Sequence, residues 1–209
     1  MSTIRKQDTI KVINEIMRDF TNITKVAAIY VNNRGTVLSQ EYNFSPFCKE
    51  VRKNSTYKKR CNQCDLYGGL EATKNLQSCP YRCHICLIDF SVPVMQDGAI
   101  LGFIMAGQAK TEDTTIQPIL SSQTDWKNNT KLKELYDSLP ILTAEQLYSA
   151  TKVLRVLVGH QFPIIEEEAS VSPKSLPIET NTPSTGEQVT NLITRINHPE
   201  IRKAILYME

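Results

Sequence analysis

The sequence lacks the features that mark several large classes of protein. Its first stretch, MSTIRKQDTIKVINEIM, mixes charged with apolar residues and holds no uninterrupted apolar core, which excludes a secretory signal. No run approaches the ~18 consecutive apolar residues that span a bilayer, and neither a P-loop nor a dinucleotide-binding fingerprint occurs. We therefore expect a cytoplasmic protein without a membrane partner, in a compartment that keeps thiols reduced.

A strong net charge is lacking too. The formal net charge of +2 is too small for the electrostatic footprint of a surface that binds nucleic acid or anionic lipid. One basic cluster between Lys49 and Arg60 is typical of a solvated helix face. The three histidines, His84, His160 and His198, suggest no group of nucleophile, base and orienting residue, so we expect no enzymatic activity.

The 209 residues suffice for one domain and an appendage. The apolar pattern predicts a domain over residues 1–168, followed by a linker rich in Ser, Thr and Pro over 169–188. Residues 189–209 contain helical fragments without a core of their own, and the chain stops in the middle of an amphipathic pattern. We therefore expect a downstream output domain that is missing from this sequence.

Apolar periodicity predicts an α+β domain. Helices are expected over residues 8–20, over 47–73 in two pieces broken near Asn54 and Ser55, over 131–138, and from a capping box at Thr143 to about 168. Strands are expected over 26–31 and 36–39, joined by a hairpin turn, and over 87–95 and 99–108, joined at Asp97-Gly98. Residues 109–130 are expected to form an irregular flap. The layout predicts an antiparallel sheet flanked by helices, with a long C-terminal helix, and resembles a PAS-type domain.

Six cysteines are concentrated in a short part of the chain: Cys48, Cys61, Cys64, Cys79, Cys83 and Cys86. Four of them form two Cys-x-x-Cys pairs separated by 18 residues, a spacing that is usual for a four-cysteine zinc site. The candidate metal ligands are Cys61, Cys64, Cys83 and Cys86, and His84 or Cys79 could replace one of them. Two other interpretations stay open, because buried thiols also line pockets as small hydrophobes, and basic neighbours favour a redox sensor.

The region around the second pair resembles a known family. The segment YRCHICLIDFSVPV from Tyr81 to Val94, followed by LGFIMAGQ from Leu101 to Gln108, is similar to the core of the PocR sensory domain. In that family a Cys-His-x-Gly-Leu-x-Asp segment precedes an apolar-Pro-apolar strand, a turn and a strand that ends in Gly-Gln. The surroundings of Cys48 and Cys61 are also similar, and the resemblance extends over roughly residues 10–165.

Two cysteines depart from the family pattern. Cys86 stands where glycine is usual, and Cys64 stands where a small polar residue is usual. The residues that this chain shares with the family are thus Cys48, Cys61, Cys83 and His84. A zinc site would therefore be particular to this chain and not a property of the family.

The resemblance implies a PAS-like fold that senses a small diol or polyol, such as 1,2-propanediol or glycerol. It also implies that residues 189–209 begin an AraC-type helix-turn-helix domain, through which alone the protein would bind DNA and control diol-utilisation genes. A homodimer through the long helix and packing of that helix on its own sheet are equally compatible with the pattern.

A diol site needs a small cavity with a few polar groups among apolar walls. The candidate ligand-binding residues are Cys48, Cys61, Tyr81, Cys83, His84, Asp89 and Gln108. Asp89 carries most weight, because a carboxylate in a buried strand is costly unless it has a partner. The alternatives are a cysteine-based zinc or redox sensor and, with least support, an enzyme that acts on diols or aldehydes through Cys83 and His84.

Overall fold

The fold is an antiparallel sheet between two layers of helices, in a computed structural model that describes residues 3–74 and 78–163. The helices are α1 (Thr3–Thr24), α2 (Pro46–Val51), α3 (Ser55–Lys74), the short 3₁₀ helix η1 (Asp125–Asn128), α4 (Thr130–Asp137) and α5 (Ala144–Gln161). The strands are β1 (Ala27–Asn32), β2 (Pro80–Arg82), β3 (Ile88–Gln96) and β4 (Ala99–Ala109). The predicted linker 169–188 and helical fragments 189–209 lie outside the described residues.

The sheet has the order β1-β4-β3-β2, and all neighbouring strands are antiparallel. β3 and β4 form the predicted hairpin, with Asp97 and Gly98 both at positive φ, as a tight turn between twisted strands requires. The predicted α+β class, with helices flanking an antiparallel sheet, is confirmed. None of the helices within the described ranges is both long enough and apolar enough to cross a membrane.

The predicted hairpin turn after residues 26–31 forms, since the Asn32 N–H donates to the Thr36 carbonyl and the Leu38 N–H donates to the Tyr30 carbonyl, but residues 36–39 are not a regular strand. β1 pairs with β4 along its whole length, from Ala27 opposite Gly107 to Asn32 opposite Gly102. Residues 36–39 form only an isolated bridge between Val37 and Val31. β4 and residues 36–39 both pair with β1 and do not compete for it; the pairing with β4 extends along the whole strand, and that with residues 36–39 is limited to a bridge.

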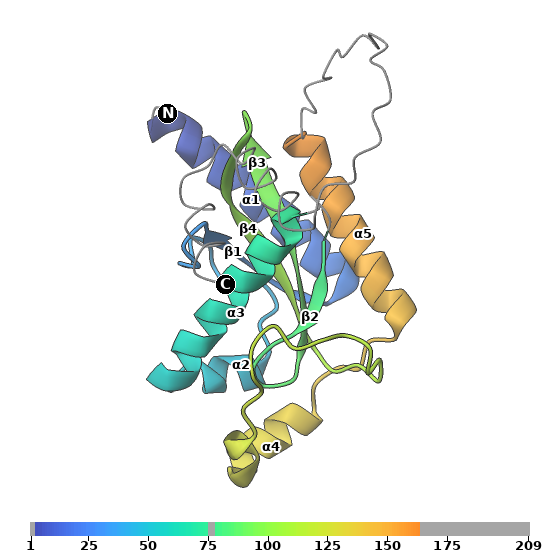
Figure 1. Cartoon of the computed structure of the whole chain (residues 1–209). Coiled ribbons are helices and arrows are strands. Elements are labelled where there is room, and N and C mark those ends of the chain that lie inside the picture. The colour runs from blue at the N-terminus through green and yellow to red at the C-terminus, as the bar shows by residue number, and fades with distance from the viewer. Residues whose placement is uncertain (1–2, 75–77, 164–209) are drawn as a thin grey trace, which may run out of the picture. The chain divides into compact units, whose positions relative to one another are not determined.

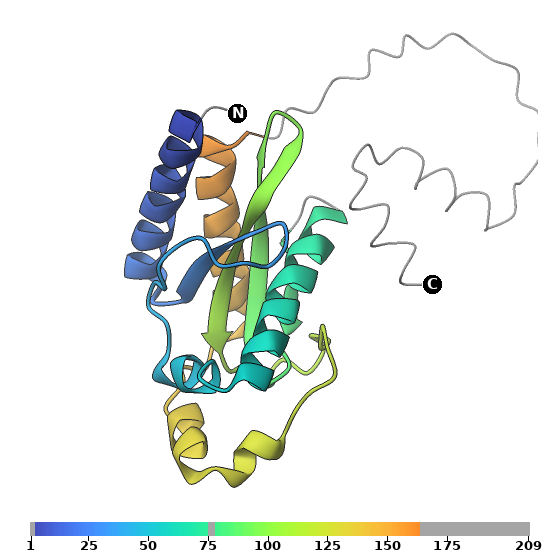
Figure 2. The same cartoon turned by 90° about the vertical axis from the view of Figure 1, so that its left-hand side faces the viewer.

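The two faces of the sheet are covered by different helices. Alternate side chains of each strand point to opposite faces, so Ala28 and Tyr30 of β1 pack with α1 and α5, whereas Ile29 and Val31 pack toward α3. Figures 1 and 2 show α1 and α5 side by side on one face and α3 on the other. α2 and α4 lie at one end of the α3 layer. The cysteines belong to this second layer.

α3 approaches the sheet closely because two consecutive glycines face it. A Cβ at Gly68 would lie 2.2 Å from the Tyr81 ring, and a Cβ at Gly69 would lie 2.4 Å from the Phe103 ring, so neither position tolerates a side chain. The Ser91 hydroxyl donates a hydrogen bond to the Gly68 carbonyl and anchors the contact. This close packing brings the cysteines of α3 next to the strands.

β2 was not foreseen from the sequence, because three residues are too few for a periodic signal. β2 pairs with β3 only at residues Ile88 to Phe90. Beyond Phe90, β3 pairs on one side only, with β4, as far as the described residues show. Pro93 lies in that part, which confirms the edge position that a proline in a strand predicts. The segment after β4 is no free flap: Arg82 of β2 exchanges backbone hydrogen bonds with Gln117 and Ile119.

α5 begins as predicted and ends earlier than predicted. Thr143 and Gln146 form the capping box. The helix ends at Gln161, because Phe162 precedes Pro163 and takes a non-helical conformation with φ −130°. The predicted continuation from 164 to 168 lies outside the described residues.

Candidate functional site

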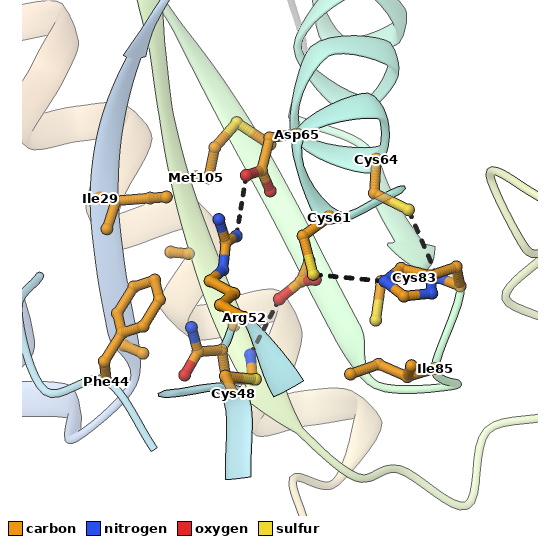
Figure 3. A pocket seen from close by; sticks show the side chains of 16 residues that line it. Ile29, Phe44, Cys48, Arg52, Cys61, Cys64, Asp65, Cys83, Ile85 and Met105 are labelled. Atoms are coloured by element: carbon orange, nitrogen blue, oxygen red, sulfur yellow. Dashed lines mark hydrogen bonds and ion pairs between the residues drawn. The ribbon is translucent and has the colours of Figure 1, made fainter. Parts of the chain in front are cut away.

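A small cavity lies between α2, α3, the β2–β3 turn and the sheet (Figure 3). Its volume is about 30 Å³. The apolar part of its wall consists of Ala27, Ile29, Phe44, Ile85, Met105 and Ala106, together with Gly107, and the polar part consists of Cys48, Arg52, Cys61, Cys64, Asp65, Cys83, His84, Asp89 and Gln108. The wall therefore combines apolar side chains and thiols with five strongly polar residues, Arg52, Asp65, His84, Asp89 and Gln108, a mixture that can bind a small molecule.

A buried ion pair crosses one wall of the cavity. The Arg52 guanidinium donates to the Asp65 carboxylate over 2.9 Å, and both side chains are largely withdrawn from solvent. Arg52 also lies over the Phe44 ring, 5.5 Å from its centroid. Burial raises the pKa of Asp65, and the positive charge of Arg52 opposes that rise. The pair ties the end of α2 to α3. Neither residue is among the candidate ligand-binding residues predicted from the sequence.

Asp89 is the central polar group of the cavity. Its Oδ1 accepts a hydrogen bond of 2.9 Å from the backbone N–H of Gln108. Burial, reinforced by the negative charge of Asp65, raises the pKa of Asp89 to about 7. Near neutral pH the carboxyl group is therefore shared between its acid and its carboxylate form, which lets it donate as well as accept.

Gln108 occupies a β-bulge at the edge of the cavity. In the β3–β4 register Ile88 lies opposite Ala109 and Asp89 lies opposite Gly107, which leaves Gln108 without a partner. Its φ of +64° is unusual for a residue other than glycine. The side-chain Oε1 accepts a hydrogen bond of 2.8 Å from the backbone N–H of Ser45, the N-cap of α2. Gly107 serves close strand packing, since a Cβ there would meet the Ile88 carbonyl at 2.3 Å.

His84 connects α3, the β2–β3 turn and the segment before α4. Its Nδ1 lies 2.9 Å from Gln123 Oε1, which can only accept, so Nδ1 carries the proton and Nε2 accepts from the Cys61 thiol at 3.2 Å. The His84 carbonyl also accepts from the Gln123 backbone, and the Gln123 carbonyl accepts from Trp126. Burial lowers the pKa of His84 to about 4, so the ring is neutral.

The turn that carries the second cysteine pair explains why glycine is usual at its end. The backbone N–H of Cys86 donates to the Cys83 carbonyl, and the N–H of Cys83 donates to the Leu87 carbonyl. This pattern is a type I turn followed by a bulge whose last residue is left-handed, and Cys86 has φ +67°. The requirement for glycine at this position is thus conformational, and Cys86 occupies it under strain.

The thiols around the cavity are neutral. Burial raises the pKa of Cys61 to about 12 and raises the pKa values of Cys48, Cys64 and Cys83 further. Cys64 accepts a hydrogen bond of 3.3 Å from the backbone N–H of His84. All six cysteines are free thiols, and Cys79 is the exposed one.

Most of the predicted ligand-binding residues converge on the cavity. Cys48, Cys61, Cys83, His84, Asp89 and Gln108 all line it. Tyr81 is buried behind it, with its ring against Gly68 and its hydroxyl without a hydrogen-bond partner. Arg52, Asp65 and Gln123 belong to no recognisable motif, and only the basic cluster around Arg52 is a weak sequence signal for one of them.

The four predicted metal ligands do not all face the same cavity. Cys61, Cys64 and Cys83 line the cavity, but Cys86 does not. Within residues 3–74 and 78–163, no three or more His, Cys, Asp or Glu side chains lie in an arrangement that could hold a metal ion. Zinc binding by this chain stays a prediction for metal analysis.

Comparisons with known proteins support the family resemblance that the motif around Asp89 indicated. Residues 9–162 match the family described as the sensory domain found in PocR. The chain is 34% identical over 149 residues to the regulatory protein PocR of Salmonella typhimurium strain LT2, a match that covers 71% of this chain and 49% of that protein. The chain thus spans about half the length of this relative.

A comparison of folds adds no argument about function. A nucleotide-free acetone carboxylase structure resembles 77% of this chain over 26% of its own length, with a TM-score of 0.41 and 12% identity. A likeness at that level is too weak to transfer chemistry. The sequence match and the shared motif are sufficient by themselves: the chain belongs to the family of sensory domains found in PocR.

Proposed function

We propose that this sensory domain binds a small uncharged diol or polyol, of the 1,2-propanediol or glycerol type, in the cavity around Asp89. The observation that carries the proposal is a carboxyl group with a pKa of about 7 inside a small, mostly apolar cavity. Such a group can accept a hydrogen bond from one hydroxyl and donate to another. A deoxy analogue would leave it unpaired, which is the basis for rejecting that analogue.

The size of the cavity favours a very small ligand. A space of about 30 Å³ holds a few water molecules at most, since one water needs ~10–15 Å³ on this measure. A three-carbon polyol therefore enters only after lining side chains move apart. Such a movement is what couples binding to a signal, because a ligand shifts an equilibrium only by its different affinity for the two states.

The charges of the lining favour a neutral ligand. Arg52 is neutralised by Asp65, and Asp89 contributes a further partial negative charge. A carboxylate ligand such as lactate would meet no free cation and would be repelled by Asp89. We therefore expect polyols to bind and their carboxylate analogues to be rejected.

Isothermal calorimetry separates these ligands. We expect 1,2-propanediol or glycerol to bind, and 1-propanol and lactate, matched in size, to bind at least tenfold more weakly because each leaves a buried polar group unpaired or adds a repelled charge. Equal affinity for 1-propanol and 1,2-propanediol, or no heat with any polyol, would contradict the proposal.

The hydrogen-bonded chain through His84 supports a route for the signal. Cys61 and His84 line the cavity, and Gln123 joins His84 to the segment that leads into α4 and α5. We propose that ligand binding shifts α3 and this segment, and that α5 conveys the change toward the AraC-type DNA-binding domain expected after residue 188. Slower or faster hydrogen exchange of residues 119–128 on adding the polyol would support this route; unchanged exchange would refute it.

A homodimer is proposed on the outer side of α5. The predicted apolar stripe of that helix, including Leu147, Leu154 and Val158, packs on its own sheet. Tyr148 and Val156 nevertheless stay 69% and 64% exposed, which is the surface that a second copy would cover. Sedimentation of a Tyr148→Glu variant beside a Ser149→Glu control tests this contact.

The second candidate function is a zinc or redox sensor, favoured by the four cysteines that line one cavity, Cys48, Cys61, Cys64 and Cys83. The raised pKa values make these thiols poor nucleophiles, which argues against redox sensing. The same values argue against an enzyme, because proton transfer from Cys61 to His84 would create two disfavoured charges. Elemental analysis of protein purified without added metal tests the zinc candidate: about one zinc per chain, lost in a Cys64→Ser variant, would establish it.

A further inference from the structure

Beside the cavity lies a second hollow, a cleft of about 250 Å³. The cavity and the cleft share the residues Ala27, Phe44, Gly107 and Gln108. The remaining lining of the cleft extends to the protein surface, where Lys25, Asn43 and Ser138 are exposed. The cleft therefore leads from solvent to the wall behind which Asp89 lies.

Three of the four shared residues are fixed in place. Ala27 and Gly107 face each other in the paired strands β1 and β4. Phe44 is buried, and its ring is covered by the Arg52 guanidinium. None of these three can leave the wall without breaking strand pairing or core packing.

Gln108 is the part of the wall that can move. As the bulged residue it has no partner in the β3–β4 ladder, and its side chain is held by one hydrogen bond, from the Ser45 backbone to Oε1. Bulges commonly re-aim a side chain next to a binding site. Breaking that one bond exchanges a protein partner for water, which costs little.

We propose that the cleft is the access path of the cavity and that the Gln108 side chain is its gate. The identity of the ligand rests on the proposed function above, whereas the path does not. Asp89 links the two, because its Oδ1 holds the backbone of Gln108 while its carboxyl group faces the cavity. A ligand that competes for Asp89 would therefore also loosen or reset the gate.

Labelling of cysteines with methyl methanethiosulfonate tests the gate without a natural ligand. Cys48 lines the cavity and is buried, and Cys79 is exposed and serves as an internal reference. The variant Gln108→Gly removes the side chain and suits the positive φ. We expect it to accelerate labelling of Cys48 about tenfold, the factor for one lost hydrogen bond, and to leave Cys79 unchanged.

Two further variants serve as a control and as an independent test of the access path. Asp97→Gly makes the same kind of change at a positive φ in the distant β3–β4 turn, and it should leave the labelling of Cys48 unaltered. Ser138→Trp places a bulky side chain at the exposed rim of the cleft and should slow labelling of Cys48. This variant keeps the proposal testable even if Gln108→Gly does not fold.

The outcomes separate the gate from the ligand. Unchanged labelling of Cys48 in both Gln108→Gly and Ser138→Trp would overturn the access path, as would equal acceleration by Asp97→Gly. Protection of Cys48 by 1,2-propanediol in the unaltered protein would support the polyol. Lack of protection, with the effects of the variants intact, would refute the polyol and leave the path established.

Discussion

The thiol of Cys61 and the imidazole of His84, 3.2 Å apart, join α3 to the turn between β2 and β3. His84 is fully buried and holds Gln123 through both its ring and its backbone carbonyl. This contact places Cys61, from the first Cys-x-x-Cys pair, against His84, which directly follows Cys83 of the second pair. The two pairs therefore meet through a histidine.

Loss of the Cys61 thiol should destabilise the domain. In Cys61→Ala the His84 Nε2 atom keeps no donor in a buried site, which costs ~1–3 kcal/mol. Urea denaturation measures the loss. Cys79→Ala, at the exposed cysteine, is the matched control and should change stability by no more than ~0.5 kcal/mol. Equal stability of the two variants would show that the contact contributes nothing.

Removal of Arg52 alone should be more damaging than removal of the whole ion pair. Arg52→Met leaves Asp65 buried without its partner, and such losses cost ~3–5 kcal/mol. The double variant Arg52→Met, Asp65→Leu should recover most of that free energy of unfolding. A double-mutant cycle by urea denaturation measures the coupling, and additive losses would contradict it. The exposed pair of Lys53 and Glu50 is the control.

Asp89→Asn should weaken binding of the polyol. The amide has nearly the same shape, but it cannot lose or gain the proton that lets the carboxyl group serve both hydroxyls. We expect the dissociation constant for 1,2-propanediol to rise at least tenfold, or ~1.4 kcal/mol. Calorimetry measures it, with Asp97→Asn in the β3–β4 turn as the control. Unchanged affinity in Asp89→Asn would remove Asp89 from the site.

Asp89, which is half-buried, and His84, which is buried, should give the stability opposite pH dependences. The pKa of Asp89 rises from 3.8 to about 7 on folding, so its contribution is fully present below 3.8 and is lost as the pH rises through 7. The pKa of His84 falls from 6.5 to about 4, so its contribution is present above 6.5 and is lost as the pH falls through 4. Between these values the two contributions oppose each other.

Single variants separate the two contributions. Relative to the unaltered protein, Asp89→Asn should gain stability as the pH rises from 4 to 7, because the variant lacks the carboxyl group whose ionisation destabilises the folded state over that range. His84→Gln should show the opposite trend over the range from 4 to 6.5. Urea midpoints at several pH values measure both, and parallel profiles for all three proteins would refute the assignment.

Cys86→Gly should stabilise the domain. The left-handed conformation at this position costs a residue with a Cβ about 1 kcal/mol, and glycine adopts it freely. Cys86→Ala is the matched control, because it removes the thiol and keeps the Cβ, so it should bring no gain. A thermal melt of each variant measures the difference. Equal gains in both would show that the thiol, and not the backbone, causes the strain.

Local sequence signals determined much of the fold. The Asp97-Gly98 turn, the break near Asn54 and the capping box at Thr143 each depend on residues within a few positions, and each occurs where it was predicted. The turn after residues 26–31 also forms, but residues 36–39 make only a bridge to β1, whose long pairing is with β4 across the sheet. β2 is too short to leave a periodic pattern, and it exists only because β3 and residues 117–119 lie beside it.

The sequence by itself marked most of the candidate ligand-binding residues, and the tertiary structure decided which of them line one cavity and which others join them there. The motif from Tyr81 to Gln108 marked Asp89 and Gln108 as polar groups within apolar strands, where such residues are costly without a role, and His84 as the histidine between two cysteines. Spacing could not show that Arg52 and Asp65 meet, or that Cys86 turns out of the cavity wall, because these positions depend on how α2, α3 and the sheet pack. Burial, which no local pattern encodes, is then the main cause of the shifted pKa values of Asp89, His84 and the thiols around the cavity.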